Sequence, residues 1–328
     1  MDRVYLYDII GLGECLLDVI VDSPSADEVS FEGKPGGAPV NVLACVAKLG
    51  LKAGYMGKLS TDVLGKFLLE VLKRAGISTE QVVLSSQHPT TLAMVSLDAK
   101  GDRNFSFYRN ATSDIMLEEC ELDYTAIEKS RVFHFGSVSM TAEPARTATL
   151  RAAAYAKEKK CLVSYDPNLR LSLWKSPEEA HHYISQGFQF ADLVKISEEE
   201  LFFLTHDTSL EQGARSLMAQ YPFKLLMVTL GSKGCCLLTN DKSFHAPTYD
   251  VPVEDTTGAG DAFWGAFLYQ YLIRNGDVKT LSDEVLKDML AFANASGSLT
   301  TTARGAIPAL PTKAAIENCL AHIPLLQE

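Results

Sequence analysis

The sequence lacks the patterns that identify several common nucleotide-dependent enzymes. No G-x-x-x-x-G-K-[ST] phosphate loop occurs, and neither do the HRD and DFG segments of protein kinases. The early Gly11-Leu12-Gly13 does not complete a dinucleotide-binding fingerprint, because Leu16 stands where the third glycine belongs. An NAD-dependent oxidoreductase is therefore a disfavoured alternative.

The chain also lacks a surplus of basic residues. Lysine and arginine number 30 against 41 aspartates and glutamates, which gives a formal net charge of −11. Proteins that bind nucleic acids or anionic membranes need a basic footprint, so neither is expected as a partner. A phosphorylated ligand stays open, because a phosphate site needs only local donors.

Paired cysteines and long apolar runs are missing as well. None of the 7 cysteines forms a CxxC pair, and they are spread along the chain, which favours reduced thiols in a reducing cytosol. Asp8, Glu14 and Asp18 interrupt the apolar N-terminus, and no basic segment precedes it. We therefore expect neither a signal peptide nor a membrane span, and a cytoplasmic location.

The sequence contains a repeated alternation of strands and helices. With 328 residues and 47% hydrophobic composition, the chain can bury a full core. From residue 131 onward, strands at 132–135, 162–165, 193–196 and 225–229 alternate with helices at 144–159, 177–188, 198–204 and 210–219. This order predicts an α/β fold with a central, mostly parallel sheet flanked by helices.

The first half of the chain and its end complete this prediction. We expect helices at 38–49 and 62–75, a strand at 53–57, a hairpin at 90–97 and 104–108, and two long helices at 261–274 and 283–302. The early strands predict a small β lid, formed by segments around 14–35 and 90–112, within a single domain over 1–328. Leu92, Met94 and Phe105 on this lid favour burial, so a homodimer through the lid is one expected assembly.

A glycine-rich turn before the first of the two long helices is the most informative segment. It reads Gly258-Ala259-Gly260-Asp261, and Asp261 begins a strongly helical run. The free N–H groups of a helix N-terminus form an anion site, supported by the helix dipole. Aspartate is also a common helix cap, so the local pattern alone leaves a purely structural interpretation open.

Two separated segments in order resemble the ribokinase-like carbohydrate kinases, the phosphofructokinase-B family. Asp255 to Asp261 matches the DTxGAGD signature of that family residue for residue. The earlier segment runs from Gly36 to Asn41 and reads GGAPVN. The resemblance covers nearly the whole chain and implies a ribokinase-like fold and an ATP-dependent sugar kinase.

The resemblance also implies a mechanism. Asp261 would accept the proton of the attacking sugar hydroxyl, and the amides of Gly258, Ala259 and Gly260 would hold the charge of the transferring phosphoryl group. ATP and Mg²⁺ are the implied cofactors. A monovalent cation, K⁺, is expected beside the anion site, at positions matching Asp255, Thr257, Thr300, Ala303 and Gly305.

The expected sugar site draws on four segments. Asp18 follows a predicted strand, where an aspartate is usually a turn residue. Phe107 and Arg109 could likewise belong to an ordinary half-exposed strand. The family resemblance makes all three expected sugar ligands. The segment 166–170 reads DPNLR and resembles that of fructokinases and 2-keto-3-deoxygluconate kinases. The expected sugar-binding residues are Asp18, Gly36, Gly37, Asn41, Phe107, Arg109, Asp166, Asn168 and Arg170.

The expected nucleotide side is less distinctive by itself. Thr229, Gly231 and Gly234 match a nucleotide-binding loop of the family but also suit an ordinary hairpin turn, and Asn294 borders the adenine pocket in relatives. The family's N-x-x-E segment reads Lys195-Ile196-Ser197-Glu198 here. Glu198 would act on Mg²⁺ through water, and Lys195 in place of asparagine can contact phosphate oxygens directly.

We therefore expect a fructokinase that phosphorylates a primary hydroxyl of fructose, with the sugar and ATP as its small-molecule partners. A 2-keto-3-deoxygluconate kinase, or another sugar or nucleoside kinase, is the alternative among enzymes. A catalytically inactive sugar sensor is the alternative from another class, and the intact Asp261 and its turn disfavour it.

Overall fold

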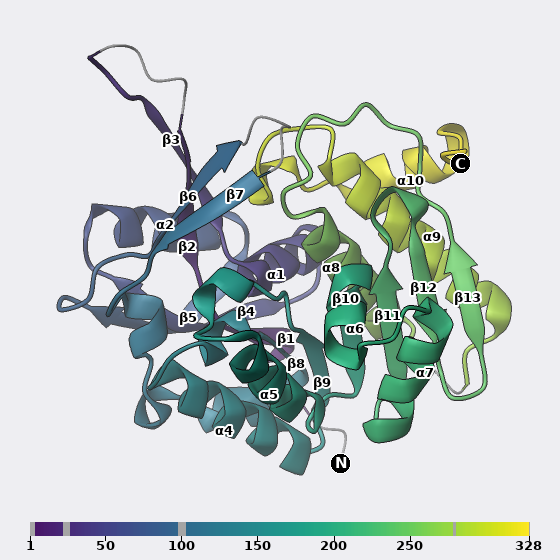
Figure 1. The fold of residues 1–328 in the computed structure, drawn as a ribbon, viewed down its shortest axis with the longest axis horizontal. Helices are drawn as coiled ribbons and strands as arrows, with labels where there is room; N and C mark the ends of the chain where they lie inside the picture. Colours follow the sequence, from purple (N-terminus) through teal and green to yellow (C-terminus); the bar gives the residue numbers. More distant parts are fainter. Residues whose placement is uncertain (1–3, 22–26, 98–102, 278–279, 328) are drawn as a thin grey trace.

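The large sheet of the computed structural model runs through the centre of the molecule. The structure describes residues 4–21, 27–97, 103–277 and 280–327. Within these ranges nine strands form one sheet in the order β13-β12-β11-β10-β9-β8-β1-β4-β5 (Figure 1). The strands are β1 (Tyr7–Leu12), β4 (Ala53–Ser60), β5 (Ile77–Ser85), β8 (Ser130–Gly136), β9 (Leu162–Asp166), β10 (Leu193–Ser197), β11 (Leu225–Thr229), β12 (Cys235–Leu238) and β13 (Ser243–Ala246).

Pairing along this sheet is parallel from β5 to β11 and antiparallel at β12 and β13. β1 is an interior strand, and its Ile10 lies between Gly54 of β4 and Phe133 of β8. This arrangement confirms the predicted α/β fold with a mostly parallel sheet.

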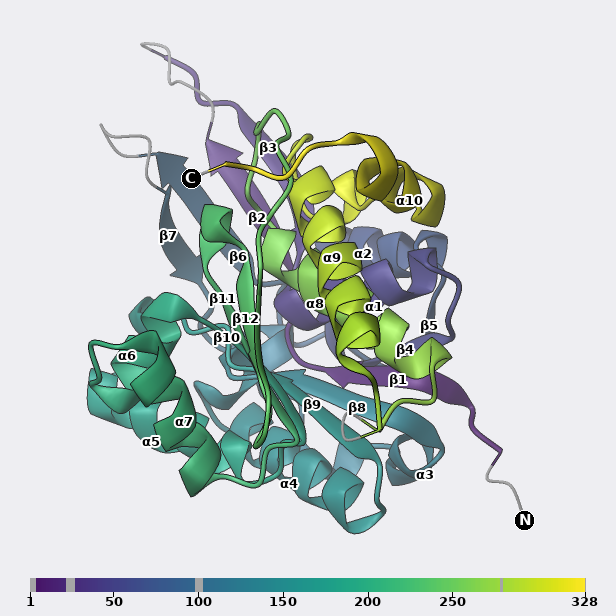
Figure 2. The same ribbon diagram turned by 90° about the vertical axis from the view of Figure 1, so that its right-hand side faces the viewer.

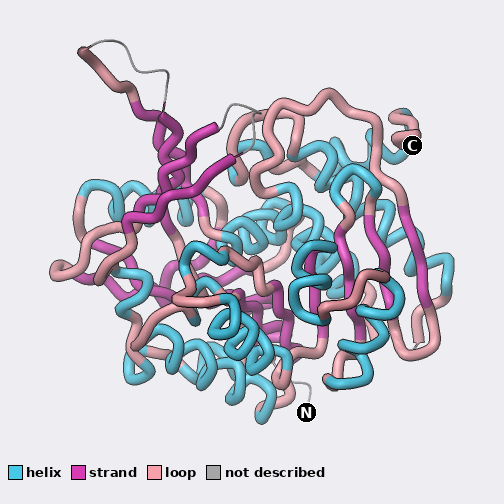
Figure 3. The backbone as a smooth tube through the Cα atoms, in the orientation of Figure 1, coloured by secondary structure: helices cyan, strands magenta, loops and turns pink. Residues whose placement is uncertain are grey.

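Helices cover both faces of the large sheet (Figures 2 and 3). Each layer buries its own apolar cluster against the strands, as expected for a parallel sheet. One layer holds α1 (Ala38–Lys48), α2 (Val63–Arg74), α8 (Ala259–Ile273), α9 (Asp283–Thr300) and α10 (Lys313–His322). The other holds α3 (Tyr124–Glu128), α4 (Ala145–Glu158), α5 (Pro177–Phe188), α6 (Glu198–Thr205) and α7 (Leu210–Gln220).

Short 3-10 turns connect these elements, and no described helix is both long and apolar enough to cross a membrane. The turns are η1 (Ser113–Met116), η2 (Glu119–Glu121), η3 (Val138–Met140), η4 (Leu171–Leu173), η5 (Gly231–Lys233) and η6 (Ile307–Ala309).

A small sheet stands at one side of the molecule, far from β13 (Figure 1). Its order is β3-β2-β6-β7, with β2 (Leu16–Val21), β3 (Phe31–Gly36), β6 (Leu92–Leu97) and β7 (Arg103–Tyr108). The predicted hairpin is β6 and β7, which pair antiparallel. Leu92 and Met94 are half-buried against the core, whereas the side chain of Phe105 lies outside the described residues.

Helix α8 is buried on nearly all sides, and this fixes the position of its first turn. The indole Nε1 of Trp264 donates to Ser164 Oγ of β9 at 2.9 Å. A Cβ at Gly265 would lie 2.7 Å from Cβ of Cys45, so the glycine lets α8 and α1 approach closely. The N-terminus of α8 is therefore held against α1 and faces the ends of the central strands.

Candidate active site

A cavity of about 360 Å³ lies where the small sheet meets the C-terminal ends of the central strands. Parallel sheets bind ligands at this edge, because the loops that leave the strands converge there. It is lined by Glu14, Leu16, Asp18, Gly37, Ala38, Asn41, Phe107, Val138, Asn168, Arg170, Lys195, Thr256, Thr257, Gly258, Gly260 and Asp261. We call it the first cavity.

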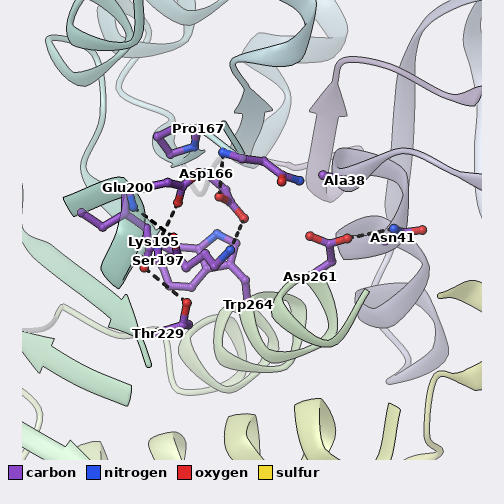
Figure 4. A network of polar contacts seen from close by, with 12 residues as sticks. Ala38, Asn41, Asp166, Pro167, Lys195, Ser197, Glu200, Thr229, Asp261 and Trp264 are labelled. Atoms are coloured by element: carbon purple, nitrogen blue, oxygen red, sulfur yellow. Dashed lines mark hydrogen bonds and ion pairs between the residues drawn. The ribbon is translucent and has the colours of Figure 1, made fainter. Parts of the chain in front are cut away.

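Asp261 is the carboxylate at the centre of this site. It lies in the first turn of α8, is 8% exposed, and its Oδ2 accepts a hydrogen bond from Asn41 Nδ2 of α1 at 2.8 Å (Figure 4). Burial raises the pKa of Asp261, while the positive charge of Lys195 and the Asn41 hydrogen bond oppose the rise. A carboxylate with a raised pKa is a stronger base, which suits it to accept a proton.

The turn before Asp261 needs glycine at position 258 and is closely packed at position 260. Gly258 has φ +76° and caps α8, and a Cβ there would lie 2.4 Å from Cβ of Ala306. A Cβ at Gly260 would lie 3.2 Å from the Nζ of Lys195. The ammonium group therefore lies against the first turn of α8, where the helix N-terminus already favours anions.

Lys195 also belongs to a buried cluster of charges (Figure 4). Its Nζ contacts Asp166 Oδ2 at 2.9 Å, and the side chains are 9% and 2% exposed. Burial alone would lower the pKa of Lys195, but Asp166, Glu200 and Asp261 together raise it. Lys195 therefore stays charged beside the turn of Asp261.

Most of the predicted sugar-binding residues meet at the first cavity. Asp18, Gly37, Asn41, Phe107, Asn168 and Arg170 line it. The Oδ1 of Asn41 is buried and has no hydrogen-bond partner among the described residues, so it can accept from a ligand. Gly36 does not line the cavity. A Cβ at Gly36 would lie 2.2 Å from Asp18 Oδ2, so the glycine leaves room for the Asp18 carboxylate.

Besides Gly36, two further predicted sugar-binding residues, Arg109 and Asp166, do not line the first cavity. The guanidinium of Arg109 is buried, where it donates to Asp114 Oδ2 at 2.7 Å and to Thr141 Oγ1 at 2.6 Å. Arg109 was expected to bind the sugar, but in the structure this buried ion pair holds its side chain within the protein. Asp166 likewise lies behind Lys195, and its Oδ1 accepts from the amide of Asn168 at 3.2 Å.

A second cavity of about 400 Å³ lies on the other side of the turn. All four residues predicted for the nucleotide loop and its adenine pocket line it, namely Thr229, Gly231, Gly234 and Asn294. Its walls are largely apolar and include Val251, Val253, Phe263 and Leu326. Thr256 and Gly260 line both cavities, so the two meet at the turn before Asp261.

The C-terminal segment forms part of this second cavity. Leu326 donates its amide to Thr248 O at 2.9 Å, and Asp250 donates to Pro324 O at 2.9 Å. Asn294 donates to the carbonyls of Ala246 and Pro247, each at 3.0 Å. The side chain of Asn294 therefore holds the strand end that frames the cavity.

Glu198 lines neither cavity. It begins α6, is half-buried, and lies close enough to Cys236 for its charge to raise the pKa of that thiol. The glutamate nearer to Lys195 is Glu200, which sequence reasoning missed. Its Oε2 accepts from the amide of Ser197 at 2.7 Å, and the S-x-x-E capping-box pattern at 197–200 was the available signal.

The residues predicted for the monovalent cation come from two adjacent segments. Asp255 joins them, since its Oδ1 accepts from the amide of Thr257 at 2.7 Å and its Oδ2 from the amide of Gly305 at 2.9 Å. Thr300 ends α9, and Ala303 lies in the loop that leads to Gly305. Across the described part of the chain, no group of three or more histidine, cysteine, aspartate or glutamate side chains could hold a metal ion.

Comparison with known proteins adds independent findings. The model of a family described as pfkB family carbohydrate kinase matches residues 8–313. Fructokinase-1 of Zea mays is 44% identical over 94% of this chain and 96% of its own length. A crystal structure of fructokinase with bound ATP from Xylella fastidiosa has a TM-score of 0.89, with 32% identity over 96% of this chain and 99% of that chain.

A second solved structure contains both a sugar and a nucleotide. It is fructokinase from Vibrio cholerae O395 in a form that binds fructose, ADP and calcium ion, with a TM-score of 0.86 and 33% identity. It covers 96% of this chain and 99% of its own.

Proposed function

The chain belongs to the pfkB family of carbohydrate kinases, and on that premise we propose that it is an ATP-dependent fructokinase. The observation that carries the proposal is the position of Asp261. It lies on the first cavity, and the turn before it is shared with the second cavity. A phosphotransferase needs such a base between the sites of its acceptor and its donor.

We assign the first cavity to the sugar and the second to ATP. The first is polar and offers carboxylate, amide and guanidinium groups, which hydrogen-bond sugar hydroxyls. The second has apolar walls suited to a flat base, and it ends at the first turn of α8, where phosphates are favoured. Fructose is chosen because the similar chains named above are fructokinases and one holds fructose.

In the proposed reaction, the carboxylate of Asp261 accepts the proton of a primary hydroxyl of fructose. The hydroxyl oxygen forms a bond to the γ-phosphorus while the bond from that phosphorus to the β,γ-bridging oxygen breaks, so the products are fructose 6-phosphate and ADP. The amides in the turn 258–260 and the ammonium of Lys195 stabilise the charge on the transferring group. The buried position of Asp261 removes water that would otherwise compete for the phosphoryl group.

We propose Mg²⁺ and K⁺ as further requirements. Mg²⁺ would neutralise the nucleotide phosphates, and the carboxylates of Glu200 beside Lys195 and of Glu198 at the start of α6 are the groups available to order its water. For K⁺, the Asp255 carboxylate already holds the segments of Thr257 and Gly305 together. An oxygen-rich loop pair of this kind fits a hard cation.

The assay that tests the function measures ADP release with four acceptors: fructose, 2-keto-3-deoxygluconate, ribose and adenosine. We expect fructose to give the highest kcat/KM. A higher value for 2-keto-3-deoxygluconate would reassign the substrate while leaving the kinase class intact. Folded protein that turns over none of the four would support a sugar sensor instead.

We also propose a homodimer through the small sheet and a cytoplasmic location. β3 is an edge strand on which Phe31 is 59% exposed, and an open strand edge with an exposed aromatic residue can pair with a second copy. The location is supported by the cysteines, which are all free thiols. The mass in solution, measured by light scattering, distinguishes the monomer from the dimer.

A further inference from the structure

Glu14 lines the first cavity, and nothing in the proposed reaction uses it. It follows β1 by two residues, is 3% exposed, and lies on the same cavity as Asp18 and Asp261. Buried glutamates are rare unless their oxygens are paired. Glu14 therefore belongs to the wall of the first cavity and is shielded from bulk water.

The two carboxyl oxygens of Glu14 have different environments. Oε1 accepts a hydrogen bond at 2.9 Å from the amide of Ala38, the first residue of α1. Oε2 is buried and has no hydrogen-bond partner among the described residues. An unpaired buried polar atom is unfavourable, and the ligand that enters the cavity is the partner that can satisfy it.

We propose that Glu14 is a further sugar-binding residue, which donates a hydrogen bond from Oε2, as the neutral acid, to an oxygen of the bound sugar. This inference rests on the proposed function, because it assigns a substrate contact in the cavity given to fructose. The neutral acid completes both hydrogen bonds of Glu14: Oε1 accepts from Ala38 while Oε2–H donates. The carboxylate could only accept.

Burial favours the neutral form of Glu14. It raises the pKa of the carboxyl group to about 7, although the backbone hydrogen bonds from Glu14 and Ala38 and the positive charge of Arg109 lower the pKa; the negative charge of Asp114 adds to the rise. Cys15 and Tyr55 also lie within its electrostatic reach, and burial keeps both uncharged. The sugar displaces remaining water on entry, which disfavours a charged carboxylate further.

The rest of the cavity makes a donor useful at this point. Asp18, Asp261 and the free Oδ1 of Asn41 all offer acceptors. Each sugar hydroxyl that donates to one of them can itself accept a hydrogen bond. The neutral acid of Glu14 supplies a donor at the Glu14 end of the cavity.

The experiment compares the wild type with Glu14→Gln at pH 6 and pH 8. A glutamine resembles the neutral acid, because its oxygen can accept from Ala38 and its amide can donate to the sugar. For a group with a pKa of about 7 that binds fructose only when protonated, the KM for fructose rises about tenfold between these pH values. We expect this rise in the wild type and a flat KM in Glu14→Gln, with similar kcat.

Two controls and a second variant complete the test. The KM for ATP should not change between pH 6 and pH 8 in either protein. The substitution Glu284→Gln, at an exposed position, should show the same rise in the KM for fructose as the wild type. Glu14→Ala should raise the KM for fructose at pH 6 by about threefold to tenfold, the range of one lost hydrogen bond. Calorimetric titration of fructose into each protein shows whether KM changes reflect binding.

The inference is overturned if the wild-type KM is flat, or if Glu14→Gln shows the same rise, because then another group titrates. It is also overturned if Glu14→Gln raises the KM at both pH values, which would mean that Oε2 must accept. In each case normal turnover of fructose leaves the proposed function standing. A protein that turns over no fructose at either pH contradicts the proposed function itself.

Discussion

Replacing Lys195 with methionine tests how the buried charges of the site are balanced. The ammonium lies 2.9 Å from Asp166, and the two side chains are 9% and 2% exposed. Removing one partner of such a pair leaves an uncompensated buried charge, which costs about 3–5 kcal/mol. Glu200 and Asp261 lose the same cation, so Lys195→Met should destabilise more than Asp166→Asn.

Proton uptake by Asp166 sets an upper limit to the part of this cost that comes from the charge of Asp166. From the ordinary aspartate pKa of 3.8, protonation at pH 7 costs about 4 kcal/mol, and at pH 5 it costs about 1.6 kcal/mol. In the variant the folded-state pKa of Asp166 lies above its unfolded value. Stability is therefore lost as the pH rises through the interval between them, and the destabilisation is largest at pH 7.

The assay is urea unfolding of the wild type, Lys195→Met, Asp166→Asn and the double variant at pH 7 and pH 5. We expect Lys195→Met to lose about 3–4 kcal/mol at pH 7 and less than half of that at pH 5. The double variant should be more stable than Lys195→Met, because the stranded charge is gone. A loss below about 1 kcal/mol at pH 7, or one that grows on acidification, would refute the reasoning.

Two further substitutions test the turn and the loops beside it. Gly258→Ala should lower the free energy of unfolding by about 2 kcal/mol or more and should also lower kcat, because the positive φ and the contact with Ala306 both oppose a Cβ. The control is Gly50→Ala, where φ is +101° but no atom lies within 4 Å of the added Cβ. In thermal unfolding, Gly50→Ala should be the milder of the two substitutions. Asp255→Asn should abolish the rate difference between potassium and tetramethylammonium buffers that we expect for the wild type, since an amide cannot accept from both Thr257 and Gly305. Equal wild-type rates in the two buffers would remove the cation from the account.

Much of the fold follows from periodicity and end signals. The helix predicted at 38–49 is α1, with proline in its first turn, and the one predicted at 62–75 is α2, capped by Asp62. The predicted alternation after residue 131 appears as β8 to β11 with their helices. These elements carry their own local signals, so the sequence sufficed to place them.

Two strands fixed by tertiary pairing were not placed individually. The predicted lid segment around 14–35 covers most of β3, but β3 was not predicted as a strand of its own. β3 contains two glycines and a proline, and it is a strand because all six of its residues pair with β2. β5 was not predicted; it lies at the edge of the large sheet beside β4. β4 was predicted to end at residue 57, but it continues to Ser60. Local strand propensity did not place β3 and β5, which form strands because neighbouring strands pair with them. No local sequence pattern indicated which strands those would be.

The candidate site was predictable where a motif was available. The turn at Asp261 and the polar residues of the first cavity were identified from signature segments, and the structure brings most of them together. The burial of Arg109 against Asp114 was not predicted, because no recognised motif contains this ion pair. Glu14 was noticed only as a charge that interrupts the apolar N-terminus, because its unpaired oxygen is a property of the folded protein.

The measurement that tests the account most directly is the kcat of Asp261→Asn. Asparagine keeps an oxygen that can accept the hydrogen bond from Asn41, which is 2.8 Å long in the wild type. The variant should therefore fold and bind ATP, as measured by calorimetry. It cannot accept the proton of the sugar hydroxyl. We predict a fall in kcat of about 10²- to 10⁴-fold, and a wild-type rate that declines as the pH falls through a pKa above the ordinary 3.8 of aspartate. Turnover within about threefold of the wild type, in folded protein, would contradict the assignment of Asp261 as the base.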